Sequence, residues 1–263
     1  TENGIKLHES SPTIINTSIS YNGAAGVYLN ATSSSPTYSN STIDHNVYGF
    51  RYASPNFSFS QPLGSPILTD NMYNGIAMDG GDITGVNKIW NTIPYDYFLL
   101  GTIRIIQGGS NVRLTIEPGN TVKAFPGVQL QVGGDCYGGE LYAVGTETNL
   151  ITFSAVNGQP GGWNGIYFKD CSDNWGGHSQ LDYCIIENGN DYNYFSEYTN
   201  QPDQISNCIV RHSLLEGAKY SNGGGLIQNC QFNENGRYPI YVSSGSTPNF
   251  TNNSFSGNNI NYI

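Results

Sequence analysis

The chain has 263 residues, of which 11% are charged, and its formal net charge is −10. Ten Lys and Arg residues cannot form the basic surface that neutralising phosphates requires, which argues against binding of DNA or RNA. The same acidic balance disfavours acidic polysaccharides as substrates. Gly, Asn, Ser, Thr and Tyr are abundant, and such a composition favours turns and half-buried strands over long helices.

No apolar run of about 18 residues occurs, so we expect no membrane-spanning segment. Residues 1–4 lack the charged and then apolar pattern of a signal segment, and we expect a mature chain or a fragment. The low lysine content and the polar composition predict an extracellular or cell-surface protein. Sequons, in a number close to that expected by chance, allow glycosylation at Asn16, Asn30, Asn40, Asn56, Asn249 and Asn252.

A pattern of about 22 to 24 residues repeats near both ends of the chain. Residues 16–22 read NTSISYN, and residues 40–46 read NSTIDHN. Related segments near the C-terminus begin at Tyr183, Asn207, Asn229 and Asn252. This self-similarity predicts a solenoid of stacked coils, in which each coil contacts only its neighbours.

The repeat register predicts which side chains point inward, because strand side chains alternate between the two faces. One inward column is expected to hold Ile19, Ile43, Ile186, Val210, Phe232 and Phe255. A second column of small or hydrogen-bonding residues is expected to hold Thr17, Ser41, Cys184, Cys208, Cys230 and Asn253. Further strands are expected at residues 27–29, 50–52 and 240–242. Two or three short strands in each coil, without helical periodicity, predict an all-β parallel β-helix.

Residues 54–125 interrupt this rhythm and contain the string LTIEPGNTVK at residues 114–123. Together with the segments that follow it up to residue 168, this string resembles the opening coils of right-handed parallel β-helix domains. Such domains, of the pectate-lyase-like superfold, occur in large prokaryotic secreted and cell-surface repeat proteins. The resemblance covers residues 88–263 well and the N-terminal 85 residues more loosely. It implies one solenoid stretch over residues 1–85 and a second over residues 86–263.

Both ends of the chain fall within a second-strand pattern, at residues 4–7 and 261–263. Solenoid ends without caps expose unpaired strand edges that can recruit another chain. We therefore hypothesise head-to-tail self-association through the solenoid ends, into a filament or an array.

β-Helix folds also carry polysaccharide lyases and glycoside hydrolases, so the fold alone does not decide whether the protein is an enzyme. The repeat register places Glu187 beside Arg211, and His212 beside Glu234, within about 10 Å of one another. Such a cluster could act as acid, base and cation-binding groups. The alternative, which we favour, is a ladder of ordinary ion pairs on a solvated face.

Two loops carry acidic pairs, Asp79 with Asp82 and Asp170 with Asp173, at a spacing that could seat Ca²⁺. Neither matches the full twelve-residue calcium loop, and we therefore predict no cofactor, with Ca²⁺ as the alternative. Several aromatic residues could stack on sugar rings or instead cover the side of the solenoid. These are Tyr192, Tyr194, Tyr198, Trp163 and Trp175.

The cysteines include no CxxC pair, which argues against a structural zinc or redox site. Cys184, Cys208 and Cys230 are expected to stack in the interior as small apolar thiols, with a strained disulfide between neighbours as the alternative.

Two functions are compatible with these features. The first, which we favour, is a non-catalytic structural or adhesive module of the cell surface. The second is a polysaccharide-active enzyme or a carbohydrate-binding module that uses the side face of the solenoid.

Overall fold

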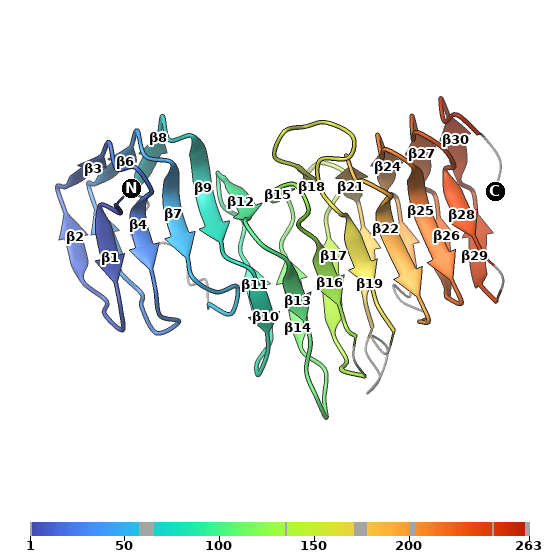
Figure 1. Ribbon diagram of the computed structural model, residues 1–263, viewed down its shortest axis with the longest axis horizontal. Coiled ribbons are helices and arrows are strands. Elements are labelled where there is room, and N and C mark those ends of the chain that lie inside the picture. The colour runs from blue at the N-terminus through green and yellow to red at the C-terminus, as the bar shows by residue number, and fades with distance from the viewer. Residues whose placement is uncertain are drawn as a thin grey trace.

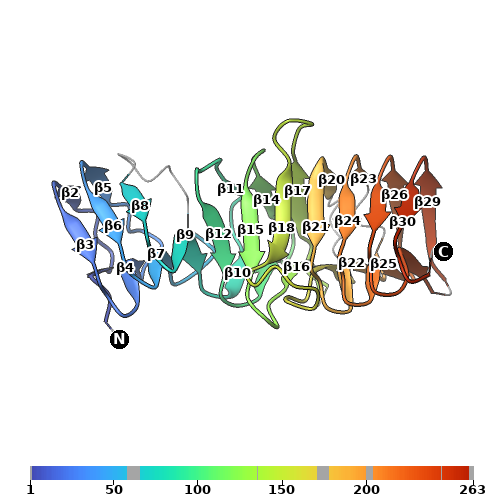
Figure 2. The same cartoon turned by 90° about the horizontal axis from the view of Figure 1, so that it is seen from above.

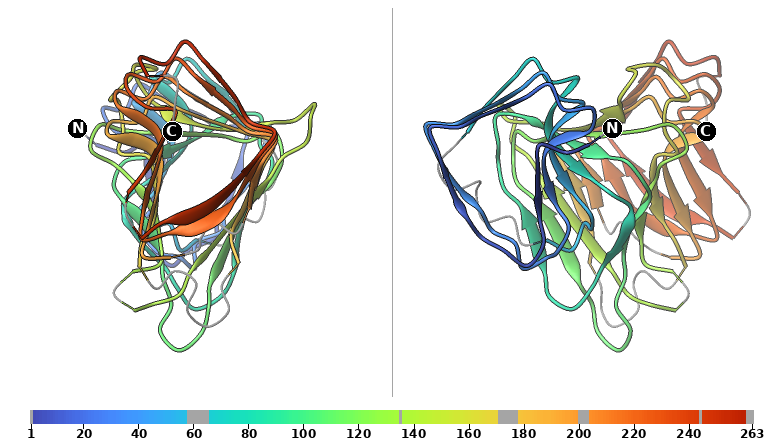
Figure 3. Two further views of the ribbon diagram at one scale, coloured as in Figure 1. Left: turned by 90° about the vertical axis from the view of Figure 1, so that its right-hand side faces the viewer. Right: turned by 60° about the vertical axis from the view of Figure 1, so that its left-hand side comes forward.

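The computed structural model describes residues 2–57, 66–134, 136–170, 178–199, 204–243 and 245–260. All regular elements in these ranges are β-strands, and the strands stack into an elongated solenoid (Figure 1). The N- and C-terminal coils lie at opposite ends of this stack, as the view from above also shows (Figure 2). Seen along its length, the solenoid has a roughly triangular outline (Figure 3). The predicted all-β parallel β-helix is confirmed.

One sheet, called sheet A here, runs through the whole solenoid as eleven parallel strands. Its strands are β1 (Ile5–Leu7), β4 (Ala25–Leu29), β7 (Tyr48–Tyr52), β9 (Tyr73–Met78), β12 (Asp96–Leu99), β15 (Thr121–Ala124), β18 (Ile151–Ala155), β21 (Cys184–Glu187), β24 (Ile209–Arg211), β27 (Gln231–Asn233) and β30 (Ser254–Ser256). Each strand comes from the next coil along the chain, so neighbouring coils are hydrogen-bonded to each other throughout this face.

The other two faces of the solenoid are built from different sheets in its two halves. In the N-terminal half, sheet B contains β2 (Thr13–Ile15) and β5 (Thr37–Ser39), and sheet C contains β3 (Ser18–Ser20), β6 (Thr42–Asp44) and β8 (Ile67–Thr69). In the C-terminal half, sheet D contains β10 (Gly81–Ile83), β13 (Ile103–Ile105), β16 (Leu130–Val132), β19 (Ile166–Phe168), β22 (Tyr192–Glu197), β25 (Glu216–Ser221) and β28 (Ile240–Val242). Sheet E contains β11 (Lys88–Trp90), β14 (Arg113–Ile116), β17 (Glu140–Val144), β20 (Gln180–Asp182), β23 (Gln204–Ser206), β26 (Gly224–Gln228) and β29 (Thr247–Thr251).

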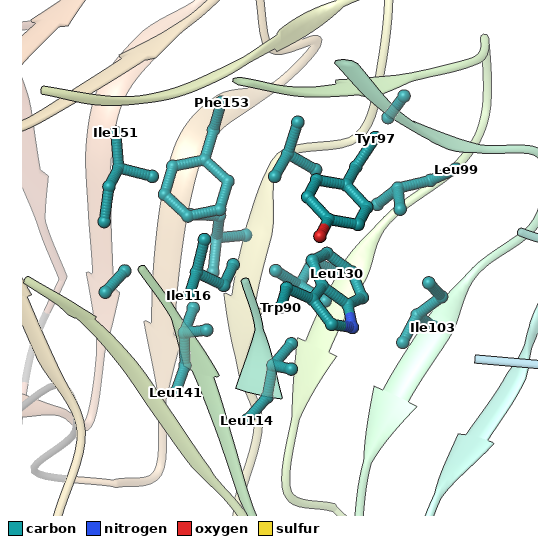
Figure 4. Packing of buried hydrophobic residues seen from close by; sticks show 14 of the residues in the cluster. Trp90, Tyr97, Leu99, Ile103, Leu114, Ile116, Leu130, Leu141, Ile151 and Phe153 are labelled. Carbon is teal, nitrogen blue, oxygen red and sulfur yellow. The ribbon is translucent and has the colours of Figure 1, made fainter. Parts of the chain in front are cut away.

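A continuous hydrophobic core fills the space between the sheets. Figure 4 shows part of it, where Trp90 and Tyr97 stack with ring centroids 5.2 Å apart. Ile116 and Phe153, which belong to the following coils, continue the same core and are at most 1% exposed. Burial of each such side chain stabilises the fold by about 1.5–3 kcal/mol. The core therefore accounts for much of the cohesion between coils.

Residues with a left-handed backbone turn the chain at the corners between sheets. Asn207, Asn229 and Asn252 have φ angles of 51°, 54° and 54° at the corner that leads into sheet A. Asn16 and Asn40 adopt the same conformation between sheets B and C. Asparagine tolerates this conformation better than most residues, which explains its abundance in the sequence.

A second series of asparagines points inward and links consecutive coils. The Asn46 side chain accepts hydrogen bonds from the backbone and side-chain nitrogens of Asn22, at 3.0 and 2.8 Å, and donates to Asn71 at 2.9 Å. Near the C-terminus, Asn235 donates to Asn258 in the same way, at 2.9 Å. These ladders satisfy backbone groups that the corners would otherwise leave buried without partners.

The first predicted inward column is not one column, because its members belong to two sheets, and the second divides in the same way, with Thr17 and Ser41 beside sheet C and the cysteines beside sheet A. Ile19 pairs with Ile43 in sheet C, whereas Ile186 pairs with Val210 in sheet A. The true sheet A column comprises Ile5, Val27, Phe50, Ile76, Tyr97, Val122, Phe153, Ile186, Val210, Phe232 and Phe255.

The reason is a shift of the repeated motif by one face of the solenoid. The inward asparagines follow sheet C strands in the N-terminal coils, but they follow sheet A strands in the C-terminal coils. The change of sheets falls between β8 and β10, near the expected interruption. Sheet A is nevertheless continuous there, through the pairs of β7 with β9 and of β9 with β12. The division into residues 1–85 and 86–263 stays a prediction.

Candidate functional site

Glu187 and Arg211 form an ion pair on the outer surface of sheet A. They are direct partners in the register of β21 and β24, as predicted, and Arg211 Nε donates to Glu187 Oε2 at 2.7 Å. The other carboxylate oxygen of Glu187 accepts a hydrogen bond from the Ser154 hydroxyl at 3.0 Å. Both oxygens of Glu187 are therefore engaged by groups in the neighbouring coils.

His212 and Glu234 form a second and more exposed pair, with 3.1 Å between His212 Nε2 and Glu234 Oε2. The side chains are 36% and 68% exposed, and both residues occupy left-handed corners, with φ angles of 55° and 52°. All four predicted residues thus lie in neighbouring coils, but as two separate pairs. Neither of the two hollows described below includes any of them.

Similar cross-coil pairs occur along the solenoid and involve the predicted calcium residues. Arg51 Nε donates to Asp79 at 2.9 Å, and Arg104 binds both oxygens of Asp82 at 2.7 and 2.9 Å. A cation at Asp79 or Asp82 would have to compete with a guanidinium group. In the ranges that the structure describes, no three His, Cys, Asp or Glu residues cluster as metal ligands would. Of the other predicted pair, Asp173 lies outside the described residues.

Trp163 and Tyr194, predicted as sugar-stacking candidates, lie inside the solenoid. Trp163 is 1% exposed and donates its indole N–H to the Glu187 carbonyl at 2.8 Å. Tyr194 is fully buried, with its hydroxyl 3.0 Å from that of Tyr220. A sugar ring cannot reach either side chain. Tyr198 is 61% exposed, and Trp175 lies outside the described residues.

Tyr192 belongs to an aromatic cluster on the outer surface of sheet D. Its ring centroid is 5.1 Å from that of Phe195, which stacks on Tyr167 at 5.1 Å and an interplanar angle of 7°. Lys219 Nζ lies 5.0 Å from the Phe195 ring centroid. These neighbours leave Phe195 only 9% exposed although it faces outward. Tyr167 donates a hydrogen bond to Glu197, and burial together with that carboxylate raises the pKa of Tyr167.

A polar hollow lies beside this cluster and has a volume of about 150 Å³. It is lined by Gln129, Asn164, Asn190, Asp191 and Tyr192, and we call it the Gln129 pocket. These residues come from three successive coils and lie just before, or at the start of, sheet D strands. Sequence reasoning identified Tyr192 alone. The repeat spacing is irregular in this part of the chain, where ten residues separate β18 from β19. The sequence pattern therefore does not show that Gln129, Asn164 and Asn190 align in neighbouring coils.

A second hollow, of about 270 Å³, lies on sheet A near the change of sheets. Its lining consists of Asn71, Met72, Tyr73, Asn74, Asp96, Phe98, Lys123 and Val156. Lys123 Nζ is 2.7 Å from Asp96 Oδ2, so the two charges neutralise each other. Tyr73 packs edge-on against Phe98, with centroids 5.3 Å apart.

The cysteine column forms a ladder of free, buried thiols. Cys184, Cys208 and Cys230 are at most 1% exposed and form no disulfide. The Cys208 sulfur accepts a hydrogen bond from the Cys184 backbone N–H at 3.4 Å. Burial raises the pKa of the Cys208 thiol well above its ordinary value. The disulfide alternative is therefore wrong, and the reading as stacked thiols is confirmed.

Three sequon asparagines, Asn16, Asn40 and Asn252, are exposed and occupy left-handed corners. The Asn40 side chain donates to Asn16 Oδ1 at 2.8 Å. Turn geometry therefore explains why asparagine occurs at these positions. Glycosylation at them, and at Asn30, Asn56 and Asn249, stays a prediction.

The stacked parallel coils define the protein as an all-β solenoid of the parallel β-helix class. Consistent with this, residues 197–263 match the family described as "Right handed beta helix region". Neither the search of curated proteins nor the search of solved structures found a match. The described residues contain no helix of the length and apolar character needed to cross a membrane.

Proposed function

We propose that the chain is a non-catalytic structural or adhesive module of an extracellular or cell-surface protein. The observation that carries this proposal is the pairing of Glu187 with Arg211 and Ser154 across three coils. Side chains that pair in this way between neighbouring strands stabilise the stacking of the coils. The extracellular location rests on the composition, which is poor in lysine and rich in Asn, Ser, Thr and Tyr.

A double-mutant cycle tests the cohesive role of this pair. We expect Glu187→Ala and Arg211→Ala each to lower the free energy of unfolding, with a coupling energy of about 1 kcal/mol that decreases at high salt. A second cycle, with Lys123→Ala and Asp96→Ala, is the matched control, because these substitutions remove another cross-coil ion pair on the same sheet. Higher stability of Glu187→Ala or Arg211→Ala would contradict the proposal, because stability gained by removing a residue is typical of a functional site.

Head-to-tail association is the second part of the proposal. Within the described part of the chain, β1 and β30 are the edge strands of sheet A, and a further parallel coil can add to either edge. That coil can come from the same polypeptide or from a second copy.

Sedimentation velocity over a range of concentrations tests this part. We expect larger species at high concentration, and we expect the double variant Ser254→Lys, Ser256→Lys in β30 to remove them through edge charges. Ser33→Lys, on an exposed corner, is the control. A single monomeric species at every concentration would rule out the association.

A further inference from the structure

We infer that the Gln129 pocket is a binding subsite for one residue of a neutral sugar. The inference deepens the adhesive part of the proposed function and rests on it, because an adhesive module needs a surface that recognises a ligand.

The pocket is preformed by the backbone of successive coils. The Asn164 backbone N–H donates to the Val128 carbonyl at 2.8 Å, and the Asn190 N–H donates to the Trp163 carbonyl at 2.7 Å. Gly165, with a φ of 78°, allows this approach, because a Cβ there would lie 2.6 Å from the Tyr192 carbonyl oxygen. A rigid, preformed hollow binds a ligand with little loss of conformational entropy.

The amide of Gln129 is the strongest indication of a polar ligand. Its side-chain nitrogen is buried and has no hydrogen-bond partner among the residues that the structure describes, although buried polar groups are normally paired. The Asn164 amide nitrogen is engaged by the Gly127 carbonyl at 3.0 Å, which leaves its oxygen to accept a further bond. Together with Asn190, the lining thus offers both donors and acceptors. Ligand hydroxyl groups, which donate and accept, match this combination.

The charges in and around the pocket disfavour an anionic ligand. Asp191 lines the pocket, and its charge, with that of Glu197, adds to burial in raising the pKa of Tyr192. A uronate or other anion would be repelled by these carboxylates. Ca²⁺ binds oxygen ligands and favours several carboxylates, whereas Asp191 is the one carboxylate in this lining and the buried Gln129 nitrogen, a donor, cannot ligate a cation.

The aromatic cluster fixes one wall of the pocket. Tyr192 lines the pocket and is held in place by Phe195, which in turn stacks on Tyr167. The surface of the pocket is almost entirely polar, which suits the hydroxyl groups of a sugar ring. The volume of about 150 Å³ limits the subsite to a single ring.

Binding to a defined panel tests the inference. The probes are immobilised oligosaccharides of glucose, galactose, mannose and N-acetylglucosamine, matched ones of glucuronic and galacturonic acid, and CaCl₂ alone. Positive probes are then titrated calorimetrically with the parent chain and with Gln129→Leu and Asn190→Ala. Gln180→Leu is the matched control, because Gln180 lies on β20 in sheet E, away from the pocket.

We expect at least one neutral sugar to bind, with affinity reduced tenfold or more in both pocket variants and unchanged in Gln180→Leu. Thermal unfolding of each variant establishes that it is folded. Lack of binding to every neutral probe, equal affinity of parent and Gln129→Leu, tighter binding of uronates, or binding of Ca²⁺ at the pocket would each overturn the inference. Binding without cleavage supports the inference and the proposed function, whereas cleavage of a bound neutral sugar would refute only the non-catalytic role.

Discussion

Asparagine performs two separate tasks in this protein, and the backbone angle distinguishes them. At Asn207 and Asn229 the residue itself adopts the left-handed conformation and turns the chain. At Asn46 and Asn235 the side chain instead reaches between coils and satisfies backbone groups. The second task is the more costly to lose, because it leaves several buried groups without partners.

Asn235→Ala is expected to lower the free energy of unfolding by about 3 kcal/mol. The substitution removes bonds to the Val210 carbonyl at 3.2 Å and to Asn258 at 2.9 Å, and each unpaired buried group costs about 1–3 kcal/mol. Denaturant unfolding measures the change. Asn249→Ala, on the exposed surface of β29, is the control and is expected to change stability by less than about 0.5 kcal/mol. Equal effects of the two substitutions would refute the ladder's role.

The stability of the protein is expected to depend on pH through the carboxyl group of Glu216. Burial raises its pKa above the ordinary value of 4.5, although Arg237 lies 3.3 Å away and acts in the opposite direction. A raised carboxyl pKa means that stability is lost as the pH rises through the folded-state pKa. We therefore expect the stability of Glu216→Gln relative to the parent to increase from about pH 4.5 to pH 7. Unfolding curves at several pH values measure this, and a difference independent of pH would contradict it.

At the scale of elements, the repeat register predicted pairings between adjacent coils but not the assembly of sheets. The pairs of Ile19 with Ile43 and of Glu187 with Arg211 follow from local self-similarity, and both occur. The motif nevertheless moves by one face near β8, and no local pattern in the sequence marks which face a motif occupies. Sheet identity depends on how the core fills, which is a property of the whole cross-section.

The side-face residues show a similar limit. Trp163 and Tyr194 are residue types typical of sugar-binding surfaces. The alternation of side chains along the strand and the course of the loop nevertheless direct them inward. Gln129 and Asn164 carry no signal in the sequence, because single amides in loops are common. Their significance arises only when coils of unequal length bring them into one hollow.

At the scale of the molecule, sheet A makes the protein a continuous scaffold. Eleven strands spaced by about 4.8 Å give a rod about 50 Å long. Each coil contacts mainly its neighbours, so the stability is distributed along the rod rather than concentrated in one centre. Such a scaffold holds surface features, including the Gln129 pocket, at fixed separations.

The central claim, a scaffold without catalysis, is tested most directly by measuring polysaccharide turnover. The parent chain is incubated with neutral and acidic polysaccharides, with and without CaCl₂, and new reducing ends and unsaturated products are quantified. We predict no product above background, so that Glu187→Ala and Arg211→Ala differ from the parent in stability alone. Product release by the parent, abolished by either substitution, would contradict this account and assign catalysis to the Glu187–Arg211 pair.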